Sequence, residues 1–308
     1  MGVFHCPLGA AYYEDEPCID CGLCIAVTEE DIFLASNKIK EHYRSLGEAK
    51  KGSKRKIAIC GKGGAGKSTF SVLLANAFQK LGYRVLIIDT DESSSGLYRM
   101  FGFTQPPWPL TRALEKVPKG GTISGMDWMQ QPEISLENIP VEYLAVRNEL
   151  NLLVAGKIIS PFQGCACSIA DLVRVFVRKL VLKEKEILLI DTEAGVESFG
   201  RGVERETAAV LITVEPSSES LNLAEKIKYM AEGLGVKTVR AILNKIPSEK
   251  VENRMTEEIE KRRIRVIGSI CHDNQISEAN LEGDALPVDS IAHNAVKEIA
   301  TRLLSEIS

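Results

Sequence analysis

The stretch IAICGKGGAGKST, residues 57–69, decides the fold of this chain. An apolar run comes first, a glycine-rich loop follows it, and the helical pattern Phe70 to Leu81 comes directly after the loop. Glycines let backbone N–H groups curl around an anion, and the start of a helix presents its positive end to the same point. The order of strand, loop and helix therefore predicts a phosphate-binding loop of the P-loop type.

Side chains within the loop indicate which phosphate compound it binds. Lys67 is placed to reach the outer phosphates of ATP, and the hydroxyl of Ser68 suits Mg²⁺. We therefore expect ATP and Mg²⁺ as ligands, with Lys67 among the catalytic residues. The predicted ATP-binding loop consists of Gly61, Lys62, Gly63, Gly64, Ala65, Gly66, Lys67, Ser68 and Thr69.

The rest of the chain repeats the alternation of strand and helix. Short apolar runs, typical of buried strands, alternate with longer helical patterns, which predicts an α/β fold with a doubly wound, mostly parallel sheet. Residues 51–308 form this expected ATPase domain, and residues 104–150, rich in Pro, Gly and Met, read as an irregular insertion. The predicted strands are Ile57–Cys60, Val85–Asp89, Leu152–Ala155, Ile187–Asp191, Val210–Val214, Val239–Leu243 and Val266–Ile270.

Composition excludes several classes of protein. The chain has 308 residues, a formal net charge of -4 and 44% hydrophobic residues, which suits one large core with a small appendage. Nucleic acid is not an expected partner, because phosphate affinity needs clustered Lys and Arg. The first residues lack a charged segment followed by an apolar one, and no segment approaches the ~20 apolar residues that span a bilayer. We therefore expect a cytoplasmic protein without a membrane partner.

Acidic residues close two of the predicted strands. Asp89 and Asp91 are two residues apart, so on an extended strand their side chains point to the same side. Asp89 could stay near Mg²⁺ while Asp91 reaches the attacking water; the alternative is an aspartate pair that serves as helix cap and turn. Asp191 ends another apolar run and is followed by Gly195. Asp89, Asp191 and Ser68 are the predicted magnesium ligands.

Lys62 makes the loop more specific. It matches the signature lysine of the deviant Walker A family, which includes MinD, the nitrogenase iron protein and the arsenite and tail-anchored-protein ATPases. The resemblance implies ATP-dependent homodimerisation across the nucleotide site, with Lys62 as a further catalytic residue that reaches the partner's nucleotide. It also implies that Asp91 is the switch I aspartate that acts on water, that Asp191 and Gly195 belong to Walker B and switch II, and that Asn244 bonds the adenine.

Two further motifs resemble one branch of that family. The run 191–202, DTEAGVESFGRG, is similar to switch II of the CooC-type accessory ATPases that mature nickel-containing carbon monoxide dehydrogenase, and the similarity covers roughly residues 54 to 308. Cys165 and Cys167 match that family's Cys-x-Cys motif. Two thiolates supply half of a soft-metal site, so a symmetric dimer could complete it. The resemblance implies nickel or zinc at this interface.

The remaining cysteines divide into a cluster and two isolated residues. Residues 1–50 form a predicted cysteine-rich head with a docking helix. A [4Fe–4S] cluster and zinc both remain open for its cysteines, because the C-x₂-C-x₂-C spacing suits a cluster and four sulfurs also suit Zn²⁺. Cys60 and Cys271, at the ends of apolar runs, are expected to be packed core residues. The predicted head ligands are Cys6, Cys18, Cys21 and Cys24.

Two functions fit these motifs, both with hydrolysis of ATP to ADP and phosphate. The first is a metallochaperone or maturation ATPase that assists nickel insertion into carbon monoxide dehydrogenase, acetyl-CoA synthase or a related client, which Cys165 and Cys167 favour. The alternative is an ATP-gated reductase that passes electrons from the head to a corrinoid or iron–sulfur protein. A membrane-positioning ATPase like MinD is a weaker third reading, because the helical pattern Val296 to Ile307 has a mixed polar face and reads more simply as packed on the sheet.

Overall fold

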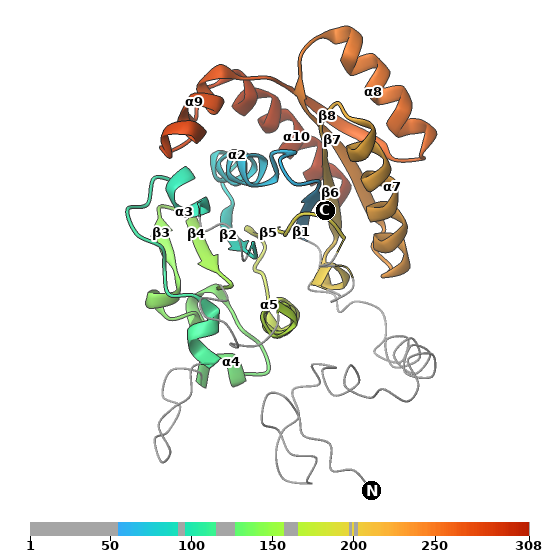
Figure 1. The fold of residues 1–308 in the computed structure, drawn as a ribbon. Helices are drawn as coiled ribbons and strands as arrows, with labels where there is room; N and C mark the ends of the chain where they lie inside the picture. The colour runs from blue at the N-terminus through green and yellow to red at the C-terminus, as the bar shows by residue number, and fades with distance from the viewer. Residues whose placement is uncertain are drawn as a thin grey trace, which may run out of the picture. The chain divides into compact units, whose positions relative to one another are not determined.

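The computed structural model describes residues 55–91, 96–114, 127–156, 166–196, 199 and 203–307 (Figure 1). The predicted head, with Cys6, Cys18, Cys21 and Cys24, lies outside the described residues, and so does Cys165. The backbone of Cys167 is described as part of a helix, whereas its side chain is not.

The described residues of the predicted ATPase domain form one sheet of eight strands in the order β3-β4-β2-β5-β1-β6-β7-β8. All neighbouring strands pair in parallel except β3 and β4. The predicted doubly wound α/β fold with a mostly parallel sheet is therefore confirmed. The strands are β1 (Lys56–Gly61), β2 (Arg84–Asp89), β3 (Ala145–Arg147), β4 (Leu150–Val154), β5 (Glu186–Asp191), β6 (Ala209–Val214), β7 (Thr238–Ile246) and β8 (Arg265–Cys271).

Helices cover both faces of this sheet (Figure 1). Within β1, Ile57 and Ile59 pack in the core with α2 and α10, whereas Ala58 and Cys60 pack in the core with α5, α7 and α8. The burial of both faces explains why the strands read as unbroken apolar runs. The α-helices are α2 (Lys67–Lys80), α3 (Leu97–Met100), α4 (Asp127–Gln130), α5 (Ala166–Lys179), α7 (Ser218–Gly233), α8 (Glu249–Lys261), α9 (Asn274–Glu282) and α10 (Ile291–Ile307).

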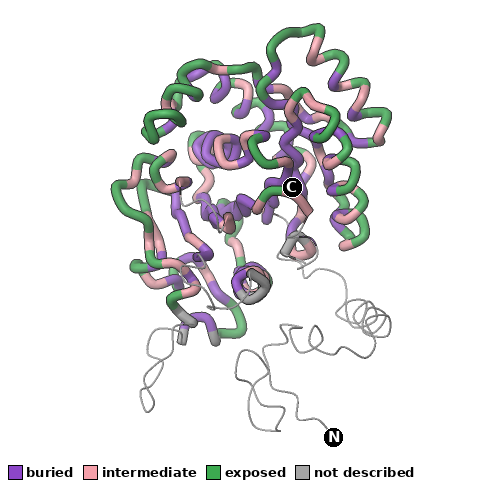
Figure 2. The backbone as a smooth tube through the Cα atoms, viewed as in Figure 1, coloured by how far each residue is buried: buried purple, intermediate pink, exposed green. Residues whose placement is uncertain are grey.

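Residues with short polar side chains cap the N-termini of several of these helices. Ser217 and Ser248 accept hydrogen bonds from the first turns of α7 and α8, and Asp273 does the same for α9. These caps satisfy N–H groups that have no partner within the helix. Figure 2 shows the result, with buried strands at the centre of the domain and exposed residues on the outer turns of the helices.

The described residues of the predicted irregular insertion, 104–114 and 127–150, include short regular elements. These are the antiparallel strand β3, helix α4 and three 3-10 turns. Trp128 anchors the segment, because its ring lies 5.7 Å from that of Tyr143 and 6.0 Å from that of Phe176 on α5. A three-residue strand at a sheet edge has too few residues to show a period in sequence. The 3-10 turns are η2 (Leu110–Leu114), η3 (Leu136–Asn138) and η4 (Val141–Tyr143), and a fourth, η5 (Val203–Glu206), lies further along the chain.

Three predictions outside the nucleotide site can be compared directly with the structure. Cys60 is buried as expected, but the prediction for Cys271 is wrong, because it is the last residue of the edge strand β8 and is exposed. Residues Val296–Ile307 belong to α10, whose apolar side chains are buried against α2 and β8. Across the described ranges, no helix is both long and apolar enough to cross a membrane.

Candidate nucleotide-binding site

The glycine-rich loop turns tightly between β1 and α2. Gly61 has φ 147°, and a Cβ at this position would lie 2.6 Å from the carbonyl oxygen of Thr213 on β6. Gly66, directly before α2, has φ 86°, and a Cβ there would clash with the side chain of Asn244. Glycine is therefore required at both positions by positive φ and by close neighbours. The loop ends on the N-terminus of α2, as an anion-binding site requires.

Lys67 is held inside the curve of this loop. Only 8% of the residue is exposed, and its Nζ donates a hydrogen bond to the carbonyl of Lys62 at 3.3 Å. Its positive charge also favours the ionised form of Asp191, and this contribution lowers the pKa of that carboxyl against the larger, opposite effect of burial. The ammonium thus lies between the P-loop backbone and the acidic end of the neighbouring strand, where it can contact phosphate oxygens.

The predicted magnesium ligands meet at the carboxyl ends of β2 and β5. Asp89 and Asp191 are directly paired across these strands, and both are almost fully buried. The hydroxyls of Ser68 and Ser71 donate to the Asp191 carboxylate, with 2.9 Å for Ser71. Burial raises the pKa of Asp191 to about 6, although the two hydroxyls and Lys67 oppose this shift. A buried carboxylate with hydroxyl neighbours is an all-oxygen donor set, which fits Mg²⁺.

Asp91 lies close to this group. Its charge contributes to the raised pKa of Asp191, and its backbone N–H donates to Oδ1 of Asp89 at 3.1 Å. The hydrogen bond from the Asp91 N–H to Asp89 forms a local turn. Such a turn is the alternative role that the sequence leaves open for the aspartate pair. The structure therefore brings Asp91 to the same end of the sheet as the predicted magnesium ligands, and gives Asp89 a turn contact as well.

The start of the predicted switch II is tied to the P-loop strand. The backbone N–H and the hydroxyl of Thr192 both donate to the carbonyl of Ile59, at 3.2 and 2.9 Å. Gly195 has φ 97°, and its N–H donates to the carbonyl of Gly61 at 3.2 Å. The backbone at Gly195 is therefore a direct neighbour of the first residue of the loop, where it can respond to a bound phosphate.

Asn244 reaches the loop from the end of β7. Its Nδ2 donates to the carbonyl of Ala65 at 2.8 Å, and 8% of the residue is exposed. This amide nitrogen therefore holds the P-loop backbone, and the adenine contact of Asn244 stays a prediction. Lys245, which sequence reasoning did not select, donates from Nζ to the carbonyl of Gly64 at 2.6 Å. The sequence signal that could have identified Lys245 is its position directly after Asn244, at the end of a predicted strand.

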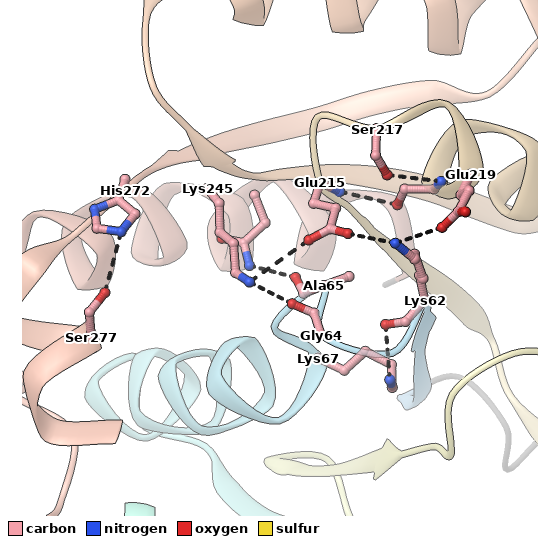
Figure 3. A network of polar contacts seen from close by, with 12 residues as sticks. Lys62, Gly64, Ala65, Lys67, Glu215, Ser217, Glu219, Lys245, His272 and Ser277 are labelled. Atoms are coloured by element: carbon pink, nitrogen blue, oxygen red, sulfur yellow. Dashed lines mark hydrogen bonds and ion pairs between the residues drawn. The ribbon is translucent and has the colours of Figure 1, made fainter. Parts of the chain in front are cut away.

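Lys62 points away from the loop, towards the start of α7 (Figure 3). Its Nζ lies 3.2 Å from Oε1 of Glu215 and 2.9 Å from Oε2 of Glu219. Hydrogen bonds to Glu219 and then Glu215 raise the pKa of Lys62, and the bond from Lys62 lowers that of Glu219. Sequence analysis selected neither glutamate as a site residue, because both follow Lys62 by more than 150 positions and no local spacing links them to the loop.

The predicted cysteine sites cannot be built from these residues. Cys165 and the four head cysteines lie outside the described part, and only the backbone of Cys167, in the first turn of α5, is placed. Among the residues that the structure does place, no group of three or more His, Cys, Asp and Glu side chains could hold a metal ion.

A glycine-rich loop on a helix N-terminus, with a lysine and two buried aspartates at the carboxyl ends of parallel strands, defines a P-loop nucleotide-binding protein. Residues 56–286 match the family described as the CobQ/CobB/MinD/ParA nucleotide binding domain. The chain belongs to this family.

Individual relatives agree with that assignment. The chain is 36% identical to an uncharacterised ATP-binding protein of Methanocaldococcus jannaschii, over 80% of this chain and all of that one. It is 32% identical to the carbon monoxide dehydrogenase accessory protein CooC of Rhodospirillum rubrum, over 74% of this chain and 88% of CooC. Among solved structures, the MinD cell division protein of Aquifex aeolicus has the same fold, with a TM-score of 0.58 at 21% identity, over 82% of this chain and 97% of MinD.

Proposed function

We propose that this chain is an ATPase that hydrolyses ATP to ADP and phosphate and uses the cycle to assist nickel insertion into a client such as carbon monoxide dehydrogenase or acetyl-CoA synthase. The observation that carries the ATPase part is the convergence of Ser68, Asp91 and Asp191 beside the P-loop. The likeness to CooC supports the maturation part.

Each residue has a separate task in this reaction. Backbone N–H groups of the loop and the ammonium of Lys67 bind the phosphates, and Asp91 orients the water that attacks the γ-phosphorus. The bond from that phosphorus to the bridging oxygen breaks, and ADP leaves. Bound Mg²⁺, held by Ser68, Asp89 and Asp191, would neutralise charge on the phosphates. When phosphate leaves, the N–H of Gly195 would lose its contact with the γ-phosphate, so the conformation of switch II would change with the nucleotide state.

Dimer formation gives Lys62 its role in the proposal. In the deviant Walker A relatives that the loop resembles, the corresponding lysine reaches the partner's nucleotide. Here the same side chain bonds Glu215 and Glu219 within its own chain, so it must leave both carboxylates before it can cross to a second subunit. ATP binding would supply the new partner, because the phosphates offer Lys62 a denser negative charge.

The client and its metal are the finer part of the proposal. Nickel or zinc would be cargo held by Cys165 and Cys167 of two subunits, and residues 1–50 would form a separate head with a [4Fe–4S] cluster or zinc on its four cysteines. The ferredoxin-like spacing of Cys18, Cys21 and Cys24 favours a second candidate function, electron transfer from that head to a corrinoid or iron–sulfur client.

Anaerobically purified full-length protein would test these proposals together. Phosphate release from MgATP should be measured beside metal content and ATP-dependent dimerisation on gel filtration. Serine at both Cys165 and Cys167 should remove nickel or zinc while ATP hydrolysis persists, whereas Cys271→Ser, at an exposed cysteine on β8, is the matched control. Absence of phosphate release would overturn the ATPase proposal.

The same preparation separates the two candidate functions. Iron that disappears when the four head cysteines become serine, with no nickel or zinc lost at the same time, would favour electron transfer. Nickel bound in proportion to Cys165 and Cys167, in a protein that contains no iron, would favour metal delivery.

A further inference from the structure

We infer that Lys245 is a positioning residue for the nucleotide site, one that holds the P-loop in its anion-binding shape and keeps Glu215 paired with a positive charge. The inference rests on the proposed binding of a nucleotide by this loop. It assigns a role to a side chain that is outside the P-loop, the aspartates and the switch segments.

The first observation is that consecutive residues hold consecutive carbonyls. Lys245 donates to the carbonyl of Gly64 at 2.6 Å (Figure 3). Asn244 donates to the carbonyl of Ala65 at 2.8 Å. Carbonyl and N–H of one trans peptide point in opposite directions. Fixing the Ala65 carbonyl outwards, towards β7, therefore directs the N–H of Gly66 towards the inside of the loop, where an anion is bound. Fixing the Gly64 carbonyl holds the N–H of Ala65, which donates to the carbonyl of Lys62 at 3.1 Å and closes the turn of the loop.

The second observation is that the backbone is shaped for this contact. Pairing between β7 and β8 shifts register twice, first between Ala241 and Ile242 and again after Leu243. At the second shift, Leu243 lies opposite Ser269 and Ile246 opposite Cys271, so β7 has one extra residue in between. Lys245 sits in this bulge with φ 57°, a left-handed conformation that is strained for a residue with a Cβ. Bulges beside functional sites redirect a side chain. Here the bulge directs Lys245 across to the P-loop.

The third observation links Lys245 with Lys62. Nζ of Lys245 lies 3.8 Å from Oε2 of Glu215, while Nζ of Lys62 lies 3.2 Å from Oε1 of the same carboxylate. Glu215 is therefore shared between the two lysines. When Lys62 leaves Glu215, Lys245 remains as its cation, so the departure of Lys62 does not leave a carboxylate without a positive neighbour.

Binding of MgADP to the full-length chain, measured by titration calorimetry, tests the inference without requiring hydrolysis. Lys245→Met removes the charge and the hydrogen bond, whereas Lys245→Arg keeps a donor and a charge. We expect Lys245→Met to weaken MgADP binding about three- to tenfold, because an exposed charged hydrogen bond contributes modestly, and Lys245→Arg to restore most of the affinity. Lys250→Met, at an exposed lysine on α8, is the matched control and should bind as the wild type does.

Backbone strain and the side-chain contact can be separated by Lys245→Gly. Glycine relieves the left-handed strain but removes the donor, so it should stabilise the unliganded fold and still weaken MgADP binding. Equal affinities of the Met variant and the wild type would overturn the inference while leaving the proposed function intact. A wild-type chain that does not bind MgADP would overturn the proposed function and this inference with it.

Discussion

Nζ of Lys62 lies 2.9 Å from Oε2 of Glu219 in the same chain. The carboxylate belongs to the first turn of α7, so the lysine that the family resemblance assigns to a dimer partner is bonded within its own subunit. Glu215, just before α7, is the other carboxylate of this contact, at 3.2 Å. Dimerisation and this intramolecular ion pair therefore compete for one ammonium.

Weakening the ion pair should favour the ATP-bound dimer. We expect Glu219→Gln to strengthen ATP-dependent dimerisation about two- to fivefold, because exposed ion pairs are weak and screened by water. Analytical ultracentrifugation with a slowly hydrolysed ATP analogue would measure the effect, which should shrink as salt is raised. Glu257→Gln on α8, at an exposed glutamate far along the chain, controls for the change in net charge. A dimer of unchanged affinity would show that the pair does not hold Lys62 back.

The buried carboxylate of Asp191 should lower the stability of the nucleotide-free protein at neutral pH. Burial raises its pKa from 3.8 to about 6, so between these values the native state holds a proton that the unfolded chain has lost. The free energy of unfolding therefore falls as pH rises through this window. A shift of this size corresponds to about 2–3 kcal/mol above the window.

Replacement by asparagine would test that account of Asp191. The variant Asp191→Asn should be more stable than the wild type at pH 7.5 by up to about 3 kcal/mol, and the difference should vanish near pH 4. Urea denaturation without nucleotide at both pH values gives the comparison, and Asp284→Asn, at an exposed aspartate, is the control. The same variant should lose Mg²⁺-dependent nucleotide binding. A pH-independent difference in stability would contradict the raised pKa.

One carboxylate caps two helices in the C-terminal part of the chain. Oδ1 of Asp273 accepts from the N–H groups of Gln275 and Ile276 in α9, and Oδ2 accepts from that of Ala292 in α10, at 3.0 Å. Burial opposes ionisation, but these backbone N–H groups and Ser290 lower the pKa of Asp273 overall. The contribution of Asp273 to the free energy of unfolding is therefore fully present above the pKa that this carboxyl has in the unfolded chain. It is lost as pH falls through the lower pKa of Asp273 in the folded protein.

Two substitutions at Asp273 should form a graded series. Asparagine has one accepting oxygen and can cap one helix, whereas alanine caps neither. We expect Asp273→Ala to destabilise the fold by about 2 kcal/mol and Asp273→Asn by about half of that, because a lost cap costs about 1 kcal/mol. Chemical denaturation at pH 7 measures both, and Ser248→Ala, which removes the cap of α8 alone, is the single-cap reference. Equal losses for Asn and Ala would refute the double cap.

The sheet was predictable because its strands are buried on both faces. Every residue of β1 and β5 is buried, so the apolar runs 57–60 and 187–190 contain no polar positions to obscure them. The P-loop was predictable for a local reason, since strand, glycines and helix are adjacent in sequence. By contrast, β3 is only three residues long and half exposed, and nothing in sequence distinguishes it from a turn.

The parts of the site that sequence missed are contacts between distant segments. Lys62 meets Glu215 at the carboxyl ends of the neighbouring strands β1 and β6, and Lys245 reaches Gly64 from a bulge whose existence depends on the register of β7 against β8. No local pattern encodes such a register. Asn244 was located correctly at a strand end, but its partner in the structure is the Ala65 carbonyl, which only the folded arrangement of β7 and the loop could reveal.

Asp91 offers the most direct test of the proposed hydrolysis. Its charge acts on Asp191, and its N–H is fixed by Asp89, so the residue is placed at the magnesium end of the site without being one of the proposed ligands. We expect Asp91→Ala to bind ATP normally but to release phosphate about 10²-fold or more slowly, since it removes the group that positions the attacking water. Because ATP then persists, the variant should accumulate as a dimer.

Single-turnover phosphate release and gel filtration on the same Asp91→Ala sample would give both results. Lys67→Ala supplies the contrasting control, because it should lose nucleotide binding and remain monomeric with ATP. Asp91→Asn preserves the shape of the side chain and the local turn, so a loss of rate in that variant as well would assign the effect to the carboxylate rather than to the backbone. Hydrolysis at the wild-type rate in Asp91→Ala would show that another group positions the water, and the segment after β2 would then have no part in catalysis.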